Sequence, residues 1–153
     1  MMHSFDFKQI HPFPAEDVFP LLCPVREIDW LDGWDYHMIH SNSGLIEEGC
    51  VFTTTHLDKE KTVWTVTKHN KQVFKVSFVR VTPNKNVVMI DISVEPVSDQ
   101  QSKTHITYPY IHINSADNIN SIGLEKDFIT NMKWWEKSIN YYLENGVMLK
   151  RRK

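Results

Sequence analysis

Apolar residues recur at every third or fourth position near the end of the chain, from Leu124 to Glu144. This is the spacing of one stripe on an α-helix, and at 1.5 Å per residue it predicts a helix about 30 Å long. Gly146 follows at the place where a left-handed cap would end the helix. The stripe consists of Leu124, Phe128, Met132, Trp135, Ile139, Tyr142 and Leu143. The alternative residues for the N-cap are Asn118, Asn120 and Ser121.

A helix with so much aromatic surface needs a broad layer to pack against, and the rest of the chain predicts one. Apolar and polar residues alternate there as they do along β-strands. The first strand begins at Phe5 and is ended by Pro12 and Pro14. Further strands are predicted at residues 34–40, 49–56, 62–69, 72–82, 87–95 and 103–113. Pro109 inside the last of them implies an edge strand or a bulge.

Two short helices are predicted between the first two strands, at residues 14–19 and 25–30, and Pro20 and Pro24 keep them short. Residues 57–61 and 96–102 are expected to be loops. Strands joined by short turns form an antiparallel meander. The predicted fold is therefore α+β: a curved seven-stranded antiparallel sheet wrapped around a long C-terminal helix, with two short helices after strand 1.

The alternation also predicts which side chains face the helix. Phe74, Val76 and Phe78 share a face with Arg80, and Trp64 shares a face with Val66. A concave sheet and a helix often leave room between them, so we expect a ligand pocket there. The candidate cavity residues are Trp30, Trp34, Trp64, Phe74, Phe78, Arg80, Ile90, Tyr108, Tyr110, His112, Phe128, Met132 and Trp135. Plain core packing is the alternative role for the tryptophans, and core hydrogen bonding is the alternative for Tyr108, Tyr110 and His112.

Arg80 interrupts an otherwise apolar face, and a buried guanidinium needs an anion beside it. One possibility is an internal ion pair with Glu27, Asp29 or Glu47. The other is that Arg80 holds a carboxylate or phenolate of a ligand.

Composition narrows the function classes. The 153 residues suit one domain, which we place at 1–147 with a basic, solvated tail at 148–153. The net charge of −2 argues against a general nucleic-acid binder. The chain shows neither a secretory signal nor an apolar run long enough to span a bilayer, so we expect a cytoplasmic protein. Cys23 and Cys50 are then free thiols, although the spacing leaves a disulfide open.

The spacing of histidines and cysteines predicts no metal site. His37 and His40 are three apart on a strand and so face opposite ways. The scattered glycines form neither a dinucleotide-binding motif nor a phosphate loop. We therefore expect no metal and no cofactor.

The segment from Val18 to Trp34, VFPLLCPVREIDWLDGW, carries a family resemblance. The resemblance continues through residues 43–52 and 62–64 and through the YLENG segment that ends at Gly146. The chain resembles the SRPBCC superfamily of START-like helix-grip proteins, in particular small bacterial members described as polyketide cyclase/dehydrase-like or lipid-transport-like. The resemblance implies a deep hydrophobic cavity between the sheet and the C-terminal helix. Members of the superfamily carry lipids, hormones or polyketides, and a minority are enzymes; no catalytic motif carries over to this chain.

Three functions remain in view. The first is binding of a small hydrophobic or amphipathic ligand, with the segments near Trp34, 57–61 and the start of the last helix controlling access. The second is a cyclase, dehydratase or hydrolase that uses His112, Tyr108 or Tyr110 as acid or base. The third is an interaction module on the outer sheet face, which a contiguous exposed apolar patch would support. The expected partner is a small hydrophobic ligand, with no nucleic acid and no integral membrane segment, in a monomer or homodimer.

Overall fold

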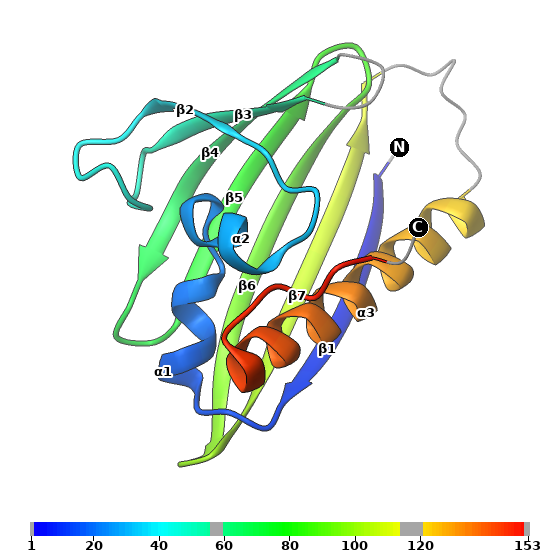
Figure 1. The fold of residues 1–153 in the computed structure, drawn as a ribbon. Helices are drawn as coiled ribbons and strands as arrows, with labels where there is room; N and C mark the ends of the chain where they lie inside the picture. The colour runs from blue at the N-terminus through cyan, green and yellow to red at the C-terminus, as the bar shows by residue number, and fades with distance from the viewer. Residues whose placement is uncertain (1, 56–59, 114–120, 152–153) are drawn as a thin grey trace.

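The computed structural model describes residues 2–55, 60–113 and 121–151, and describes Ser121 and Ile122 by their backbone only. Figure 1 shows one sheet and one long helix, as the alternation and the helical stripe predict. The elements in chain order are β1 (Met2–His11), α1 (Ala15–Val18), the 3₁₀ turn η1 (Phe19–Leu21), α2 (Pro24–Trp30), β2 (His37–His40), β3 (Val51–Thr55), β4 (Lys61–Asn70), β5 (Lys75–Thr82), β6 (Asn86–Ser98), β7 (Gln101–His112) and α3 (Ser121–Asn145).

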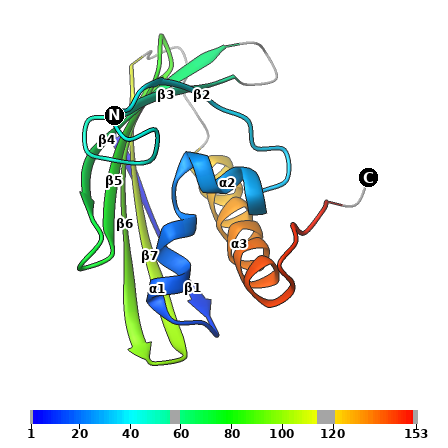
Figure 2. The same ribbon diagram turned by 60° about the vertical axis from the view of Figure 1, so that its left-hand side comes forward.

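The sheet is antiparallel throughout, in the order β1-β7-β6-β5-β4-β3-β2. It curves around α3, and α1 and α2 lie on the same face of the sheet as α3 (Figure 2). The predicted α+β fold, a curved seven-stranded sheet gripping a C-terminal helix, is confirmed. Gly146 ends α3 as predicted: its φ is +73° and its N–H donates to the Tyr142 carbonyl at 2.7 Å. The proposed N-caps Asn118 and Asn120 lie outside the described residues.

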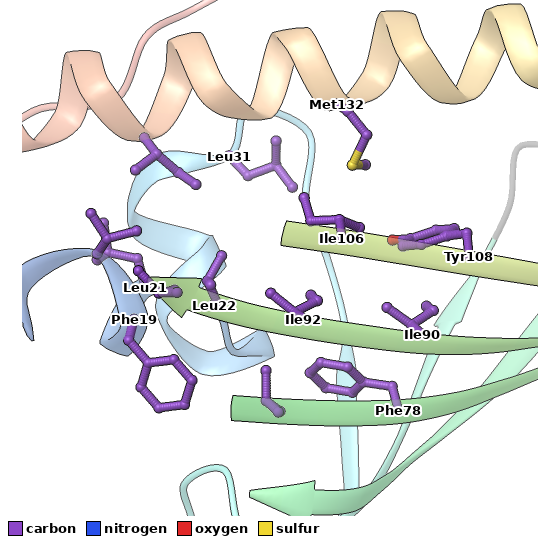
Figure 3. Packing of buried hydrophobic residues seen from close by; sticks show 14 of the residues in the cluster. Phe19, Leu21, Leu22, Leu31, Phe78, Ile90, Ile92, Ile106, Tyr108 and Met132 are labelled. Atoms are coloured by element: carbon purple, nitrogen blue, oxygen red, sulfur yellow. The ribbon is translucent and has the colours of Figure 1, made fainter. Parts of the chain in front are cut away.

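The core lies between the inner face of the sheet and the three helices. Ile106 and Tyr108 of β7 point toward Met132 of α3, and Ile90 and Ile92 extend this layer on β6 (Figure 3). A second contact joins α2 to α3, because the rings of Trp30 and Trp135 meet edge to face with centroids 5.6 Å apart. The Trp30 Nε1–H donates to the Leu21 carbonyl at 2.8 Å, so the buried indole is satisfied.

Several element boundaries differ from the prediction. Residues 72–74 form a turn instead of the start of a strand, and Phe74 has a φ of +56° that no strand residue adopts. The expected loop at 96–102 is mostly strand, because β6 and β7 continue to a tight hairpin. The strand predicted at 34–40 begins only at His37.

The expectation that Pro109 marks an edge strand is wrong, because β7 lies between β1 and β6. Its ladder with β6 is interrupted at this point: no partners are assigned between Val88–Tyr110 and Asp91–Thr107. Proline lacks the N–H that a continuous ladder needs, so the interruption lies where the missing donor predicts an irregularity.

We expected the C-terminal tail to be solvated, but part of it packs against the rest of the protein. Leu149 pairs with Leu31 in a parallel bridge, and the Arg151 N–H donates to the Asp32 carboxylate at 2.9 Å. The Arg151 guanidinium lies 4.9 Å from the Trp134 ring centre. As far as Arg151, the tail therefore packs against α3 and the residues that follow α2. Arg152 and Lys153 lie outside the described residues.

The outer face of the sheet has two different halves. Lys75, Ser77 and Asp91 make one half polar. On the other half, a row of paired apolar residues crosses five strands: Val63, Val81, Val87, Ile111 and Met2. Val63 and Met2 are 40% and 61% exposed. This row is the contiguous apolar surface that an interaction module would need.

Cys23 and Cys50 are both buried and free, so the alternative of a disulfide is excluded. Burial raises the pKa of both thiols. Within the described parts of the chain, no helix is long and apolar enough to cross a membrane.

Candidate functional site

A cavity of about 460 Å³ lies between the inner face of the sheet and the N-terminal part of α3, within the range of small-molecule sites. Helix α3 lines it with Leu124, Asp127, Phe128, Asn131, Met132 and Trp135. The sheet contributes Thr54, Thr55, Trp64, Arg80, Tyr108 and Tyr110, and the segment after α2 contributes Gly33, Trp34 and Asp35. The exposed lining residues mark the mouth of the cavity: Gly33, Asp35, Thr55, Asp127 and Asn131.

One wall of the cavity is aromatic, because alternate residues of β3 and β4 point inward. The ring of Trp64 stacks on Phe52 with centroids 5.4 Å apart and meets Trp34 edge to face at 6.3 Å. Both indole N–H groups have partners in the protein, Thr54 Oγ1 at 2.9 Å for Trp64 and the Pro24 carbonyl at 3.0 Å for Trp34. The wall therefore offers a ligand ring faces and no free indole donor.

Arg80 of β5 brings a positive charge to this wall. Its guanidinium carbon lies 5.2 Å from the Trp64 ring centre, 5.8 Å from that of Tyr108 and 5.7 Å from that of Tyr110. The guanidinium also donates to the Tyr110 hydroxyl at 3.3 Å. Three ring faces hold the cation in place without neutralising it, because a π face carries no net charge.

The expected ion pair of Arg80 with Glu27, Asp29 or Glu47 is wrong. Asp29 pairs with Arg26 at 3.0 Å, and Glu47 accepts hydrogen bonds from Ser43 and Ser41. Within the described ranges, no carboxylate lies in ion-pair distance of Arg80. The reason is spatial: α2 and the β2–β3 connection carry these acids to other parts of the surface or core.

Tyr108 and Tyr110 are neighbouring inward residues of β7, with ring centroids 6.1 Å apart. Tyr108 also packs on Phe128 of α3 at 5.0 Å. Burial raises the pKa of Tyr108, and the charge of Arg80 opposes this rise. The Tyr108 hydroxyl therefore stays protonated at neutral pH. The Tyr110 oxygen already accepts from Arg80, so its own O–H proton remains for another acceptor.

A second, much smaller hollow of about 20 Å³ lies beside Glu27 of α2. Glu27 is 7% exposed, and burial raises the pKa of its carboxyl to about 8. Four aromatic side chains line both this hollow and the large cavity: Trp34, Trp64, Tyr108 and Trp135. From the sequence, Glu27 is predicted only as a possible partner of Arg80, and its buried position is not predicted. The available signal was the helical spacing, since Glu27 lies one turn from Cys23, Trp30 and Leu31, all of which are buried.

Most predicted site residues meet at these two hollows. Trp34, Trp64, Arg80, Tyr108, Tyr110, Phe128, Met132 and Trp135 line the large cavity, and Phe78 and Ile90 line the small hollow. Trp30, Phe74 and His112 line neither. Trp30 is fully buried between α2 and α3, and the ring of His112 meets that of His3 edge to face at 5.3 Å.

Phe74 is carried elsewhere by its turn. It packs on Phe19 with ring centroids 5.7 Å apart and lines a separate outer hollow of about 400 Å³ beside η1. The polar residues at the mouth of the large cavity are not among the residues predicted from the sequence. Asp127 and Asn131 could have been found, because each lies one helical turn from Leu124 or Phe128 on the same side of α3.

The described part of the chain holds no cluster of three or more histidine, cysteine, aspartate or glutamate side chains placed to bind a metal ion. The large cavity offers one guanidinium and two phenols on its inner wall and the carboxylates of Asp35 and Asp127 at its mouth, and the small hollow adds the Glu27 carboxyl.

Solved structures share this arrangement of sheet and helices. The aromatase/cyclase Zhui from Streptomyces sp. R1128 matches with a TM-score of 0.70 and 8% identity, over 97% of this chain and 100% of the other. Norcoclaurine synthase from Thalictrum flavum, in complex with dopamine and hydroxybenzaldehyde, matches with a TM-score of 0.67 and 13% identity, over 99% and 90%. Ara h 8.0201 matches with a TM-score of 0.66 and 14% identity, over 95% and 100%.

The chain has the helix-grip fold that these structures share. The resemblance found in the sequence is therefore confirmed at the level of the fold. No protein-family model and no curated protein matches the chain. At identities of 8–14%, the helix-grip neighbours establish the architecture and leave the activity to be argued from the cavity.

Proposed function

We propose that the protein binds a small amphipathic molecule with an aromatic or acyl skeleton in the cavity between the sheet and α3. The observation that carries the proposal is a 460 Å³ cavity with aromatic walls and a guanidinium that no described carboxylate neutralises. The apolar part of the ligand would gain about 25 cal/mol for each Å² that leaves water. Arg80 would bind an anionic or electron-rich oxygen of the ligand, and the Tyr110 O–H would orient it.

The structural neighbours support this ligand class. Norcoclaurine synthase was solved with dopamine and hydroxybenzaldehyde, which are small phenols, and Zhui is an aromatase/cyclase. The free buried thiols suit a cytoplasmic location, and the net charge of −2 suits a protein without nucleic-acid partners. We further propose that residues 1–147 form a single domain that acts as a monomer or homodimer.

The test uses the fluorescent dye anilinonaphthalene sulfonate, which combines aromatic rings with an anion. We expect the wild-type protein to bind it, and Arg80→Met to weaken binding at least about tenfold, because hydrogen bonds to charged groups contribute about 1.5–3 kcal/mol. Lys75→Met is the matched control, since Lys75 lies on the same strand but on the outer face. Equal affinity of the dye for wild type and Arg80→Met would contradict the proposal.

A second experiment addresses the identity of the natural ligand. Mass spectrometry of small molecules extracted from the undenatured, purified protein would reveal one that copurifies uniformly. We expect it to carry an aromatic or acyl skeleton with an oxygen for Arg80.

A cyclase- or dehydratase-type enzyme is the second candidate, because Tyr108 and Tyr110 both line the cavity. His112, the third proposed acid or base, lines neither hollow and drops out of this role. The outer apolar row fits an interaction module, but no residue in it indicates the chemistry of a partner, so the cavity carries the proposal.

A further inference from the structure

Glu27 occupies an unusual position for a carboxyl group. It lies in the middle of α2, 7% exposed, and its backbone is held at both sides: its N–H donates to the Cys23 carbonyl at 2.9 Å and its carbonyl accepts from Leu31 at 2.8 Å. Among the residues that the structure describes, none makes a hydrogen bond or ion pair with its side chain. A buried carboxyl without a partner costs stability, so a contribution to folding does not explain its presence here.

The space beside Glu27 has the size of one small polar group. The hollow measures about 20 Å³, which is close to the volume that a single water-sized group requires. Its remaining walls are apolar and include Phe52, Phe78 and Ile92. A carboxyl that faces so small a space can serve one hydrogen-bonding atom and no more.

The hollow adjoins the large cavity. Tyr108 and Trp64 line both spaces, and both also contact the Arg80 guanidinium on the side of the large cavity. Glu27 and Arg80 therefore line neighbouring spaces that share these aromatic side chains. A molecule in the large cavity that extends past these rings brings its end to Glu27.

The charge state of Glu27 follows from its surroundings. Burial raises the pKa of the carboxyl to about 8, so it carries its proton at pH 7 and can donate an O–H hydrogen bond. The titratable groups that face it are Cys23 at the start of α2 and Tyr108 of β7, with the cation of Arg80 beyond Tyr108. Burial raises the pKa of both Cys23 and Tyr108, and both groups are therefore uncharged near pH 7.

We propose that the ligand carries a carbonyl oxygen which enters the small hollow and accepts a hydrogen bond from the Glu27 carboxyl, while another part of the ligand lies beside Arg80 in the large cavity. This inference rests on the proposed binding function and narrows it to a carbonyl-bearing aromatic molecule. Glu27 is then a specificity-determining residue, because a carbonyl oxygen at this end of the ligand increases the affinity and a methylene group does not.

The test compares two ligands of nearly equal shape. In 2-acetylnaphthalene a carbonyl occupies the place of a methylene group in 2-ethylnaphthalene, and neither molecule titrates. At pH 6 we expect the wild-type protein to bind the ketone about five- to tenfold more tightly, the contribution of one net hydrogen bond. This preference should disappear as the pH rises through about 8, because the carboxylate cannot donate.

Three variants identify the group responsible. Glu27→Gln keeps a donor but cannot titrate, so it should keep the preference for the ketone and lose its dependence on pH. Glu27→Met should bind both ligands with similar affinity. Cys23→Ser is the control for the neighbouring thiol and should show the wild-type pH profile. If Glu27→Met fails to fold, the pH profile of Glu27→Gln decides the question.

The outcomes separate the two proposals. If neither naphthalene binds to any variant, the proposed binding function itself fails. If both bind to the wild-type protein with equal affinity, or the preference for the ketone persists unchanged at pH 10, the cavity binds ligands but the role of Glu27 is overturned.

Discussion

His11 of β1 is joined to Asn140 of α3 by a 2.7 Å hydrogen bond between the imidazole Nδ1 and the amide Oδ1. The Asn140 amide nitrogen donates to the Ile10 carbonyl at 3.0 Å, so its oxygen is the atom that faces His11. The imidazole therefore carries its proton on Nδ1, and its Nε2 accepts from the Thr104 hydroxyl at 2.8 Å. This contact attaches the C-terminal half of α3 to β1 at the edge of the sheet.

Removing the Asn140 side chain should weaken this attachment. Asn140→Ala leaves the buried imidazole N–H without its acceptor, so we expect the free energy of unfolding to fall by about 1–3 kcal/mol. Urea denaturation measures the change. Asn145→Ala, at the exposed end of the same helix, should change stability by less than about 0.5 kcal/mol. Equal unfolding midpoints for the two variants would show that the His11 contact contributes little.

The same imidazole predicts a loss of stability in acid. Burial lowers the pKa of His11 in the folded protein, although the Asn140 hydrogen bond and the charge of Glu136 oppose the shift. Below about pH 6.5 the unfolded chain takes up a proton that the folded chain resists, so stability falls as the pH drops. Melting temperatures between pH 7.5 and 5 should fall less for His11→Gln than for the wild type. His40→Gln, at an exposed position, should follow the wild-type curve.

For Glu27 we expect stability to depend on pH with the opposite sign. Its folded pKa of about 8 lies above the unfolded value of about 4.5, so the folded state holds the extra proton between these values. Stability should therefore be full below about pH 4.5 with respect to this group and fall as the pH rises toward 8. Glu27→Gln should remove this fall and make the protein more stable than the wild type at pH 8. Denaturant unfolding at pH 5 and pH 8 measures it, and parallel losses in both proteins would argue against a buried carboxyl.

Much of the fold could be predicted because its signals are local. The stripe from Leu124 to Leu143 needs only the helical period, and Gly146 needs only its freedom to adopt a positive φ. The inward positions of Trp64, Arg80 and Tyr108 follow from alternation along single strands. These elements define both the sheet and most of the cavity wall.

The parts that could not be predicted depend on contacts between distant segments. Phe74 continues the alternation of its strand, yet the turn before β5 directs it to the outer hollow with Phe19. Glutamate is a residue type usually found at the surface, and Glu27 is buried only because α2 packs against the sheet and Trp135. Arg151 is read as a solvated tail residue, because nothing in the local sequence shows that Trp134 lies beside it.

The cap of α3 offers a test of backbone conformation alone. Gly146 has a φ of +73°, and a Cβ at this position would meet no atom within 4 Å. Gly146→Ala should therefore destabilise the protein only through backbone strain, by about 1–2 kcal/mol. Gly146→Asn is the matched control and should cost less, since asparagine adopts the left-handed region more readily. Thermal melts of the three proteins should rank glycine above asparagine and asparagine above alanine.

The mouth of the cavity can be blocked without disturbing the core. Asn131 lies on α3, is exposed, and lines the cavity, so a tryptophan there costs little folding energy while its ring covers the opening. We expect Asn131→Trp to weaken binding of 2-ethylnaphthalene at least about tenfold with a melting temperature near that of the wild type. Lys133→Trp places the same ring on an exposed position outside the lining and should bind like the wild type. If both tryptophan variants bind the ligand equally well, the ligand does not enter between the sheet and α3, and the outer hollow beside Phe74 becomes the site to examine.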